Sequence, residues 1–345
     1  MGKLSASNLL SSQFTRVPPV LTTDLRGKTA VVVGANTGIG LECAKHFARM
    51  GPARLILCCR SEQKGQQAAE KIAKETNFRS DVEILDLSSF NSVVAFAKRL
   101  EGEPVDILVL NAAVSWNEYQ ETKDGWEEAL QVNHLSTALV SFLLVPNLVK
   151  AAELHSSQSR VVVVASEVHH WTQFDQQAVQ QGILSQLNGK EHCTPEVMAI
   201  RYPTTKLLNV LFTRAFYQHL STAHSSSLIP TSVNPGFCAT ELARNLPLGE
   251  RIRMRIMHAL IARSAEQGAR QLVWASLGPD GKDGPHVRYA MSGQYVTLAS
   301  TAEPSDFVIS REGFAAQEKI WNETIEVLSQ AAPEVKRIVG QYFSN

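Results

Sequence analysis

Short runs of branched apolar residues recur along this chain, each followed by residues with helical spacing, and this alternation restricts the possible folds most strongly. The runs lie at 28–33, 54–59, 105–110, 160–164 and 227–233, with a more polar run at 81–85. Strands this apolar must be covered on both faces, which is typical of parallel sheets with helical crossovers. We therefore predict an α/β fold with a single doubly wound parallel sheet flanked by helices, which binds ligands at the carboxyl ends of its strands.

The same pattern divides the chain into a domain and its appendages. Helical spacing predicts helices at 41–50, 63–76, 88–100, 125–149 and 204–221. Residues 24–300 form the predicted domain, with an N-terminal extension at 1–23 and a C-terminal helical extension at 301–345. Two stretches interrupt the alternation, near 173–195 and 246–265, and we interpret both as substrate-loop insertions over the site.

Composition excludes several kinds of partner. The 33 basic and 33 acidic side chains cancel, so the chain offers no global field for nucleic acid or an anionic bilayer. The longest apolar run, Leu135 to Val149, is too short and too interrupted to span a membrane. Five cysteines give an odd count, and no Cys/His ligand repeat is present. We expect a cytoplasmic protein that acts on small molecules, with no metal and no transmembrane segment.

The first apolar run ends in a glycine-rich turn, Gly34 to Gly40, with the spacing G-x-x-x-G-x-G. Glycine lets the backbone approach a pyrophosphate, and the start of the following helix offers unpaired N–H groups to hold it. A plain structural turn is the alternative. The position directly after the first strand favours a dinucleotide site.

Tyr202 and Lys206 lie four residues apart at the head of an apolar helical run. One helical turn places the phenol and the ammonium on the same face, where the cation favours the phenolate and makes tyrosine a usable acid or base. The same spacing arises by chance on solvated helix faces, so it gains weight only together with the glycine turn. Pro203 suits the first position of a helix, which predicts that Tyr202 lies at the helix entrance.

Together, the glycine turn and the Tyr-x-x-x-Lys pair resemble the short-chain dehydrogenase/reductase superfamily, whose parallel sheet is of Rossmann type. The resemblance covers roughly residues 24–300, and it continues through Asp86-Leu87, Leu110 to Ala113, Asn133, Ser166 and Asn234 to Gly236. Within the superfamily the chain looks most like the retinol-dehydrogenase-like branch and its fungal relatives, through 57–61, 206–214, 265–269 and 292–295. The segment Leu110 to Ala113 departs from the family pattern, since it lacks the usual first asparagine and closing glycine.

The resemblance implies a catalytic set. Ser166 would hydrogen-bond the substrate oxygen, and Tyr202 would exchange a proton with it. Lys206 would lower the tyrosine pKa and bind the nicotinamide ribose, while Asn133 would hold a water that links the lysine to solvent. Hydride transfer changes the charge on the substrate oxygen, and a phenol beside an ammonium is suited to match that change. Simpler roles stay open, a turn or cap for Ser166 and a buried hydrogen bond for Asn133.

The resemblance also implies a cofactor site. Its assigned residues are Gly34, Asn36, Thr37, Gly38, Ile39, Gly40, Arg60, Lys64, Asp86, Asn111, Ala112, Tyr202, Lys206, Pro235, Gly236 and Thr240. Cofactor choice depends on the end of the second strand, where an acid suits the ribose hydroxyls of NAD(H) and a base suits the 2′-phosphate of NADP(H). Arg60 stands there without an acid, so we predict NADP(H). The alternative, a solvated basic patch at the helix start, explains Lys64 better than Arg60, and a helix-initiating threonine is the alternative for Thr240.

The leading hypothesis is an NADP(H)-dependent oxidoreductase that interconverts a hydroxyl and a ketone or aldehyde on a lipophilic small molecule, for example a polyketide, terpenoid, retinoid or steroid-like secondary metabolite. One alternative is a catalytically idle nucleotide-binding sensor or scaffold. Another is a peripheral membrane enzyme that uses 251–263 as an interfacial helix. The apolar face at 135–148 permits a homodimer as well as a monomer. The apolar residues of the first insertion either line a substrate pocket or pack on one another; they are Trp171, Phe174, Ile183, Leu184 and Leu187.

Overall fold

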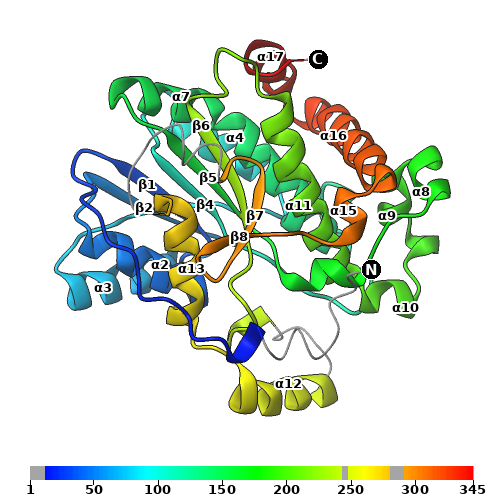
Figure 1. Ribbon diagram of the computed structural model, residues 1–345, viewed down its shortest axis with the longest axis horizontal. Helices are drawn as coiled ribbons and strands as arrows, with labels where there is room; N and C mark the ends of the chain where they lie inside the picture. The colour runs from blue at the N-terminus through cyan, green and yellow to red at the C-terminus, as the bar shows by residue number, and fades with distance from the viewer. Residues whose placement is uncertain (1–11, 243–247, 280–290, 345) are drawn as a thin grey trace.

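The computed structural model describes residues 12–242, 248–279 and 291–344, which fold around one sheet (Figure 1). The sheet has eight strands in the order β3-β2-β1-β4-β5-β6-β7-β8. They are β1 (Thr29–Val33), β2 (Arg54–Cys59), β3 (Asp81–Ile84), β4 (Ile107–Leu110), β5 (Ser159–Val164), β6 (Leu228–Val233), β7 (Gln294–Thr297) and β8 (Ser300–Ala302). Every neighbouring pair is parallel except β7 and β8. The predicted doubly wound fold is confirmed, because strand order reverses between β1 and β4.

The central strands are apolar on both faces because each face is covered by helices. Val31 and Val33 of β1 belong to one core cluster, and Ala30 and Val32 belong to the other. Consecutive side chains of a strand point to opposite faces, so one run of residues contributes to two cores.

The helices form two layers (Figure 1). One layer contains α2 (Gly38–Arg49), α3 (Glu62–Thr76) and α13 (Ala265–Leu277). The other contains α4 (Phe90–Arg99), α6 (Ser136–Leu143), α7 (Val145–Leu154) and α11 (Arg201–His219). Serine caps begin three of these helices, since Ser61 Oγ accepts the N–H of Lys64, Ser89 Oγ that of Ser92 and Ser264 Oγ that of Gln267.

The single helix predicted at 125–149 is wrong. The segment begins as α5 (Glu128–Leu130), continues as a π-helical turn at Gln131–Leu135, and then forms α6. The helix bends by 45° before α7. Pro146 lies in the first turn of α7, where its missing N–H is tolerated, and this placement is the physical reason for the break.

No single helix of the described residues has the length and apolar character needed to cross a bilayer. The two helices Glu128–Leu143 and Val145–Leu154, which meet at a bend, are together long and apolar enough for a span. Their residues lie mostly inside the core.

The last two strands were not predicted. β7 and β8 are four and three residues long, and their sequences, QYVT and STA, contain no branched apolar run of the kind that marks the other strands. They pair at the edge of the sheet, where β7 continues the parallel order beside β6.

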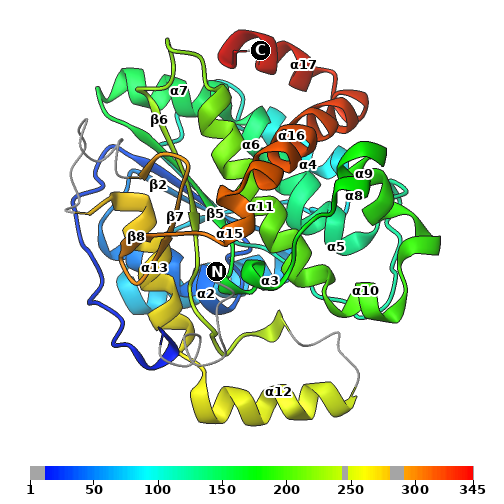
Figure 2. The same ribbon diagram turned by 45° about the vertical axis from the view of Figure 1, so that its right-hand side comes forward.

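The first insertion folds as short helices: α8 (Gln176–Gln181), α9 (Ile183–Asn188) and α10 (Pro195–Ala199). The C-terminal extension forms α15 (Asp306–Ile309), α16 (Arg311–Ala331) and α17 (Glu334–Tyr342). In Figure 2, α16 crosses in front of α11 and runs beside α8 and α9. The second insertion contains α12 (Leu248–Ile261), which lies at the lower edge of the molecule in both views (Figures 1 and 2). Residues 246 and 247 of that insertion lie outside the described residues, as do 1–11 of the N-terminal extension.

The C-terminal helices cover the face that the sequence offered for a dimer. Trp321 of α16 stacks on Phe212 of α11 with ring centroids 6.0 Å apart, and it meets Phe142 of α6 at 5.3 Å. Phe343, after α17, packs on Phe216 at 4.9 Å. The apolar surface of α6 and α11 is therefore covered by the chain itself.

Candidate active site

The glycine turn joins β1 to α2 and has no room for a side chain at Gly34 or at Gly40. Gly34 has a φ of +79°, and a methyl group there would lie 2.9 Å from Ala112. A methyl group at Gly40 would lie 2.3 Å from the carbonyl oxygen of Gly34. The side chain of Asn111 donates to that same oxygen at 3.1 Å, which fixes the turn against the end of β4. Asn111 and Ala112 therefore lie against the glycine turn, and their contact with the adenosine ribose stays a prediction.

The start of α2 is open to an anion. Thr37 is the N-cap, but its side chain makes no capping hydrogen bond, and the first turn contains no acid. The unpaired N–H groups and the positive end of the helix dipole are therefore available. Gly38 has a φ of +58°, and a methyl group there would lie 3.7 Å from Cγ2 of Thr240. The loop after β6 thus faces the glycine turn.

The other two residues of the turn are partly buried. Asn36 and Ile39 lie beside Thr37 and Gly38 with intermediate exposure. Ile39 packs under α13, where a methyl group at Gly268 would lie 3.2 Å from it.

Arg60 directly follows β2 and is exposed, and within the described part of the chain its side chain makes no ion pair. Lys64 is also exposed, one turn into α3. The side chain of Asp86, after β3, accepts from the N–H and the hydroxyl of Ser88 at 3.0 and 2.8 Å. Arg60 and Asp86 therefore lie at the carboxyl ends of adjacent strands, on the half of the sheet where the resemblance put the adenosine.

The loop after β6 is held by Asn234, whose side-chain oxygen accepts the N–H of Gly236 at 3.0 Å. Pro235 is buried and Gly236 has a φ of +81°. A methyl group at Gly236 would lie 2.3 Å from Nη1 of Arg263, so the guanidinium rests directly on this glycine.

Tyr202 and Lys206 lie on the first turns of α11, which begins three residues earlier than predicted. Pro203 is the third helical residue rather than the first; the first four N–H groups of a helix have no partner, so proline is tolerated there too. Lys206 Nζ donates to the carbonyl oxygen of Val164 at 2.7 Å and lies 5.4 Å from the centre of the Tyr202 ring. The pair therefore lies against the carboxyl end of β5.

Burial dominates the ionisation of this pair. It lowers the pKa of Lys206 to about 7, because the 1% exposed ammonium has lost most of its hydration. It also raises the pKa of Tyr202, and the neighbouring Cys238 adds to the rise. The rise comes from burial and from Cys238, so the lowering of the tyrosine pKa that the resemblance implies for Lys206 stays a prediction. The phenol is kept as an acid, and the amine titrates near neutrality.

Asn133 lies inside the π-helical turn and is 1% exposed. Its amide bridges Val114, accepting the N–H at 2.8 Å and donating to the carbonyl at 2.9 Å, and it also donates to Thr205 Oγ1 at 3.0 Å. The side chain thus ties the segment after β4 to the helix that carries Lys206. π turns of this kind are frequent at functional sites.

Ser166 follows β5 and Ala165 and caps the 3₁₀ turn Glu167–Trp171. The chain after that turn reaches α11, where the hydroxyls of Thr172 and Thr204 lie 3.3 Å apart. Ser166 and Tyr202 therefore lie on segments that contact each other at one edge of the sheet, and Ser166 is also the cap that its residue type suggests.

A buried histidine that the sequence did not single out for this role supports Ser166. The Nδ1 of His169 lies 2.6 Å from the carbonyl oxygen of Ser166, and its Nε2 lies 3.1 Å from the N–H of Ser305. The carbonyl needs a donor and the N–H needs an acceptor, so the ring is neutral with its proton on Nδ1. The only sequence signal is the adjacent pair His169-His170, which belongs to no Cys/His ligand repeat.

The N-terminal extension also reaches the site, which the sequence gave no reason to expect. The Gln13 side chain is 6% exposed and donates to the carbonyl oxygens of Phe237 and Ile261, both at 2.7 Å. Its oxygen accepts the N–H of Phe237 at 3.1 Å. One glutamine therefore joins the loop after β6 to the end of α12.

A buried carboxylate follows Ser166. Glu167 is 6% exposed and accepts from the hydroxyl of Ser12 at 3.2 Å. Burial raises the pKa of Glu167, whereas Ser12 and the nearby Arg263 oppose the rise. Arg263 Nη2 in turn donates to the carbonyl oxygen of Ser12 at 2.6 Å. Ser12 is thus bonded both to Glu167, which follows Ser166, and to Arg263, which rests on Gly236.

The first insertion packs mainly on itself and on α16. Phe174, Ile183 and Leu184 are buried, and Glu323 of α16 accepts the N–H groups of Ile183 and Leu184 at 3.1 and 2.8 Å. Leu187 is partly buried against the same core, whereas Trp171 is 56% exposed. The sequence left two alternatives for these apolar residues, lining a substrate pocket or packing on one another. All of them except Trp171 are packed against the core.

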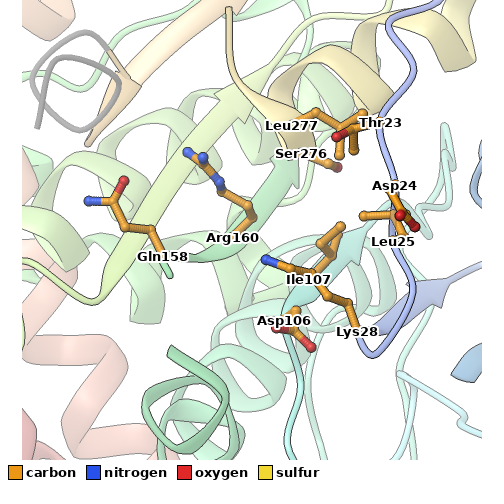
Figure 3. Close-up of a pocket in the computed structure, with 10 residues that line it drawn as sticks. All are labelled: Thr23, Asp24, Leu25, Lys28, Asp106, Ile107, Gln158, Arg160, Ser276 and Leu277. Atoms are coloured by element: carbon orange, nitrogen blue, oxygen red, sulfur yellow. The ribbon is translucent and has the colours of Figure 1, made fainter. Parts of the chain in front are cut away.

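A cavity of about 60 Å³ lies at the opposite end of the sheet (Figure 3). Lys28, Asp106 and Arg160 line it at the amino ends of β1, β4 and β5. Because doubly wound sheets bind ligands at the carboxyl ends, this cavity is not the predicted site. No group of His, Cys, Asp and Glu side chains within the described ranges is arranged to hold a metal ion.

A glycine turn at the first crossover and a Tyr/Lys pair beside the next strands define the class of nucleotide-binding α/β oxidoreductases. The family model described as short chain dehydrogenase matches residues 28–178. The short chain dehydrogenase/reductase dmxR8 of Cryptosporiopsis sp. (strain 8999) is 33% identical over 332 residues, which are 94% of this chain and 98% of that protein. The chain belongs to the short-chain dehydrogenase/reductase superfamily.

Solved structures share the fold. A crystal structure of a protein from Mycobacterium Paratuberculosis has a TM-score of 0.63 at 26% identity, and the match covers 89% of this chain and 97% of that one. The NADPH-bound carbonyl reductase from chicken fatty liver has a TM-score of 0.56 at 17% identity, and the match covers 85% and 97%. Placement in the retinol-dehydrogenase-like branch stays a prediction.

Proposed function

We propose that this chain is an NADP(H)-dependent oxidoreductase that interconverts a ketone or aldehyde and the corresponding alcohol on a lipophilic small molecule. One observation carries the proposal. Lys206 is buried one turn after Tyr202, and its ammonium bonds the last carbonyl of β5, two residues before Ser166. This arrangement supports a site at the carboxyl ends of the strands, where this fold binds ligands, built from the phenol, the ammonium and the hydroxyl of Ser166.

The residues present fit a dinucleotide. The cradle has no space for a side chain at Gly34 or Gly40, Gly38 has a positive φ, and the uncapped start of α2 offers N–H groups to a pyrophosphate. Arg60 would hold the 2′-phosphate, since it is exposed at the end of β2 with no acid beside it in the sequence. Asp86, Asn111 and Ala112 would contact the adenosine, with Lys64 nearby. Pro235, Gly236 and Thr240 would border the nicotinamide half.

When bound, the reduced cofactor supplies the hydride that reaches the carbonyl carbon. Tyr202 gives its proton to the carbonyl oxygen as negative charge develops there, and its raised pKa keeps it protonated for this step. Ser166 donates a hydrogen bond to the same oxygen. Lys206, with a pKa of about 7, then returns a proton to the phenolate. The hydrogen bond from Asn133 to Thr205 holds the π turn against α11, the helix that carries Lys206.

The substrate proposal rests on the apolar character of the segments around the site. Trp171 is exposed at the end of the turn that Ser166 begins, and Phe237 lies in the loop after Gly236. A lipophilic secondary metabolite fits these surroundings, and dmxR8, to which the chain is similar, is a fungal protein. We also propose a cytoplasmic location, which the free thiols of all five cysteines support.

Purified protein mixed with NADPH and a panel of aliphatic, aromatic and polycyclic carbonyl compounds tests the proposal. We expect loss of NADPH absorbance that depends on the carbonyl compound, and faster turnover for larger apolar ketones than for small polar ones. NADP⁺ with the corresponding alcohols tests the reverse direction. NADPH binding with no turnover for any compound in either direction would instead support the nucleotide sensor.

A further inference from the structure

We propose that α12 and the residues around Phe14 form a surface that docks on an anionic phospholipid bilayer. Four large apolar side chains are exposed on it: Phe14 (69%), Ile252 (49%), Ile256 (57%) and Leu260 (73%). Phe14 and Leu260 are the two most exposed large hydrophobic residues of the described chain. Apolar side chains exposed together in this way mark an interaction surface.

The exposed side chains form one stripe along α12. Ile252, Ile256 and Leu260 follow one another at intervals of four residues, so they lie on the same face of the helix. Arg253 and Arg255 are exposed on either side of this stripe, because each residue turns the helix by ~100°. An apolar stripe between two cationic borders is the pattern of helices that lie in a membrane interface.

The opposite face of α12 attaches the helix to the body of the protein. His258 packs on Phe237 with ring centroids 5.2 Å apart, and the carbonyl of Ile261 accepts from Gln13 at 2.7 Å. His258 lies ~200° around the helix from Ile256 and from Leu260. The stripe therefore faces away from the loop after β6, and it is not the side of the helix that would meet a substrate.

Gln13 joins Phe14 to the same surface. Its bonds to Phe237 and Ile261 hold the N-terminal segment against the end of α12. Phe14 and Leu260 border one open hollow of about 360 Å³, together with Arg16 and Arg270. The two apolar tips and their cationic neighbours thus belong to one continuous surface.

The charge of this surface indicates which partner binds it. The sequence of α12 contains three arginines, one histidine and one acid, Glu250, although the whole chain is balanced at 33 basic and 33 acidic residues. Arg16, Arg253 and Arg255 are exposed, and among the described residues none of them forms an ion pair. This local excess of positive charge complements anionic headgroups, whereas the apolar tips suit the acyl boundary beneath them. A second copy of the chain would bring the same positive charges together.

Vesicle flotation with the full chain tests the proposal. We expect the protein to float with vesicles of phosphatidylcholine and phosphatidylserine at low salt, and to stay behind with pure phosphatidylcholine or at high salt. Leu260→Glu should lower the bound fraction at least tenfold. Arg253→Gln and Arg255→Gln should each lower the partition coefficient by about fivefold.

Leu154→Glu is the matched control, since Leu154 is 63% exposed at the end of α7, and its binding should equal that of the unaltered chain. Thermal melting of each variant verifies that it is folded. Failure to float with phosphatidylserine vesicles, or equal flotation of Leu260→Glu, would overturn the proposal. Sedimentation that shows a dimer broken by Leu260→Glu would also overturn it, because the stripe would then belong to a second copy.

Discussion

His169 fixes the backbone of Ser166 through a hydrogen bond of 2.6 Å to its carbonyl oxygen, while its other ring nitrogen accepts from Ser305 of the C-terminal extension. The segment that carries the proposed catalytic serine is thereby attached to a part of the chain far away in sequence. Protonation would break the bond from Ser305, because the imidazolium has no acceptor nitrogen, whereas Nδ1 would still donate to the carbonyl oxygen of Ser166.

Acid should destabilise the protein partly through this residue. Burial lowers the pKa of His169 to about 3 and that of His134 to about 4, whereas both titrate near 6.5 when unfolded. The unfolded state binds more protons below pH 6.5, so the free energy of unfolding falls as pH decreases from there toward the folded values. We expect the stability advantage of the unaltered chain over His169→Gln to shrink by ~2 kcal/mol between pH 7 and pH 5. Urea unfolding of both proteins at the two pH values measures this stability difference. The same difference at pH 7 and pH 5 would contradict a neutral His169 in the folded protein.

Removal of the phenol should abolish most of the chemistry and leave binding intact. Tyr202→Phe keeps the ring beside Lys206 but removes the proton donor, so turnover should fall at least ~10²-fold. NADPH affinity, measured by fluorescence titration, should change little. A turnover number close to that of the unaltered enzyme would remove Tyr202 from the mechanism.

Cofactor preference should depend on Arg60. Arg60→Asp replaces a partner of the 2′-phosphate with a repulsive carboxylate, so the ratio of kcat/KM for NADPH over NADH should fall at least ~10-fold. Lys64→Asp makes the same charge change one turn into α3 and serves as the control, with a smaller expected effect. Equal ratios in Arg60→Asp and in the unaltered enzyme would transfer the role to another residue.

The N-terminal extension should matter for cofactor use. Gln13→Ala leaves two buried carbonyls without their donor, and each lost bond should lower the free energy of unfolding by no more than about 1–3 kcal/mol. The substitution also releases the loop that follows Gly236. We expect the KM for NADPH to rise at least ~10-fold, with a smaller change in kcat. Gln13→Glu should behave similarly because it keeps only the acceptor, and Phe14→Ala should keep the original KM. An unchanged KM in Gln13→Ala would show that the contact is structural only.

The C-terminal helices should keep the chain monomeric through the α6 and α11 face. Trp321 is 3% exposed and packs on Phe142, Phe212 and Phe343. Trp321→Ala should cost ~3–5 kcal/mol of unfolding free energy and promote association, since it uncovers apolar surface. Denaturant unfolding and analytical ultracentrifugation measure the two effects. A stable dimer of the unaltered chain that involves α11 would contradict this expectation.

Several features of this protein were determined locally and were therefore readable from its sequence. The apolar runs at 28–33 and 160–164 require cover on both faces, and that requirement alone leads to a parallel, doubly wound sheet. The glycine turn from Gly34 to Gly40 follows from the need for positive φ and close backbone approach. The spacing of Tyr202 and Lys206 places them on one helical face wherever the helix packs.

Other features depend on contacts between distant segments, and only the tertiary structure decided them. Gln13 meets Phe237, and Ser305 meets His169, across more than a hundred residues, and no local pattern marks either pair. Burial of Lys206 shifts its pKa through loss of hydration, a property of the assembled core rather than of the residue. Likewise, only the folded chain shows that its own C-terminal helix α16 packs on the apolar face of α11.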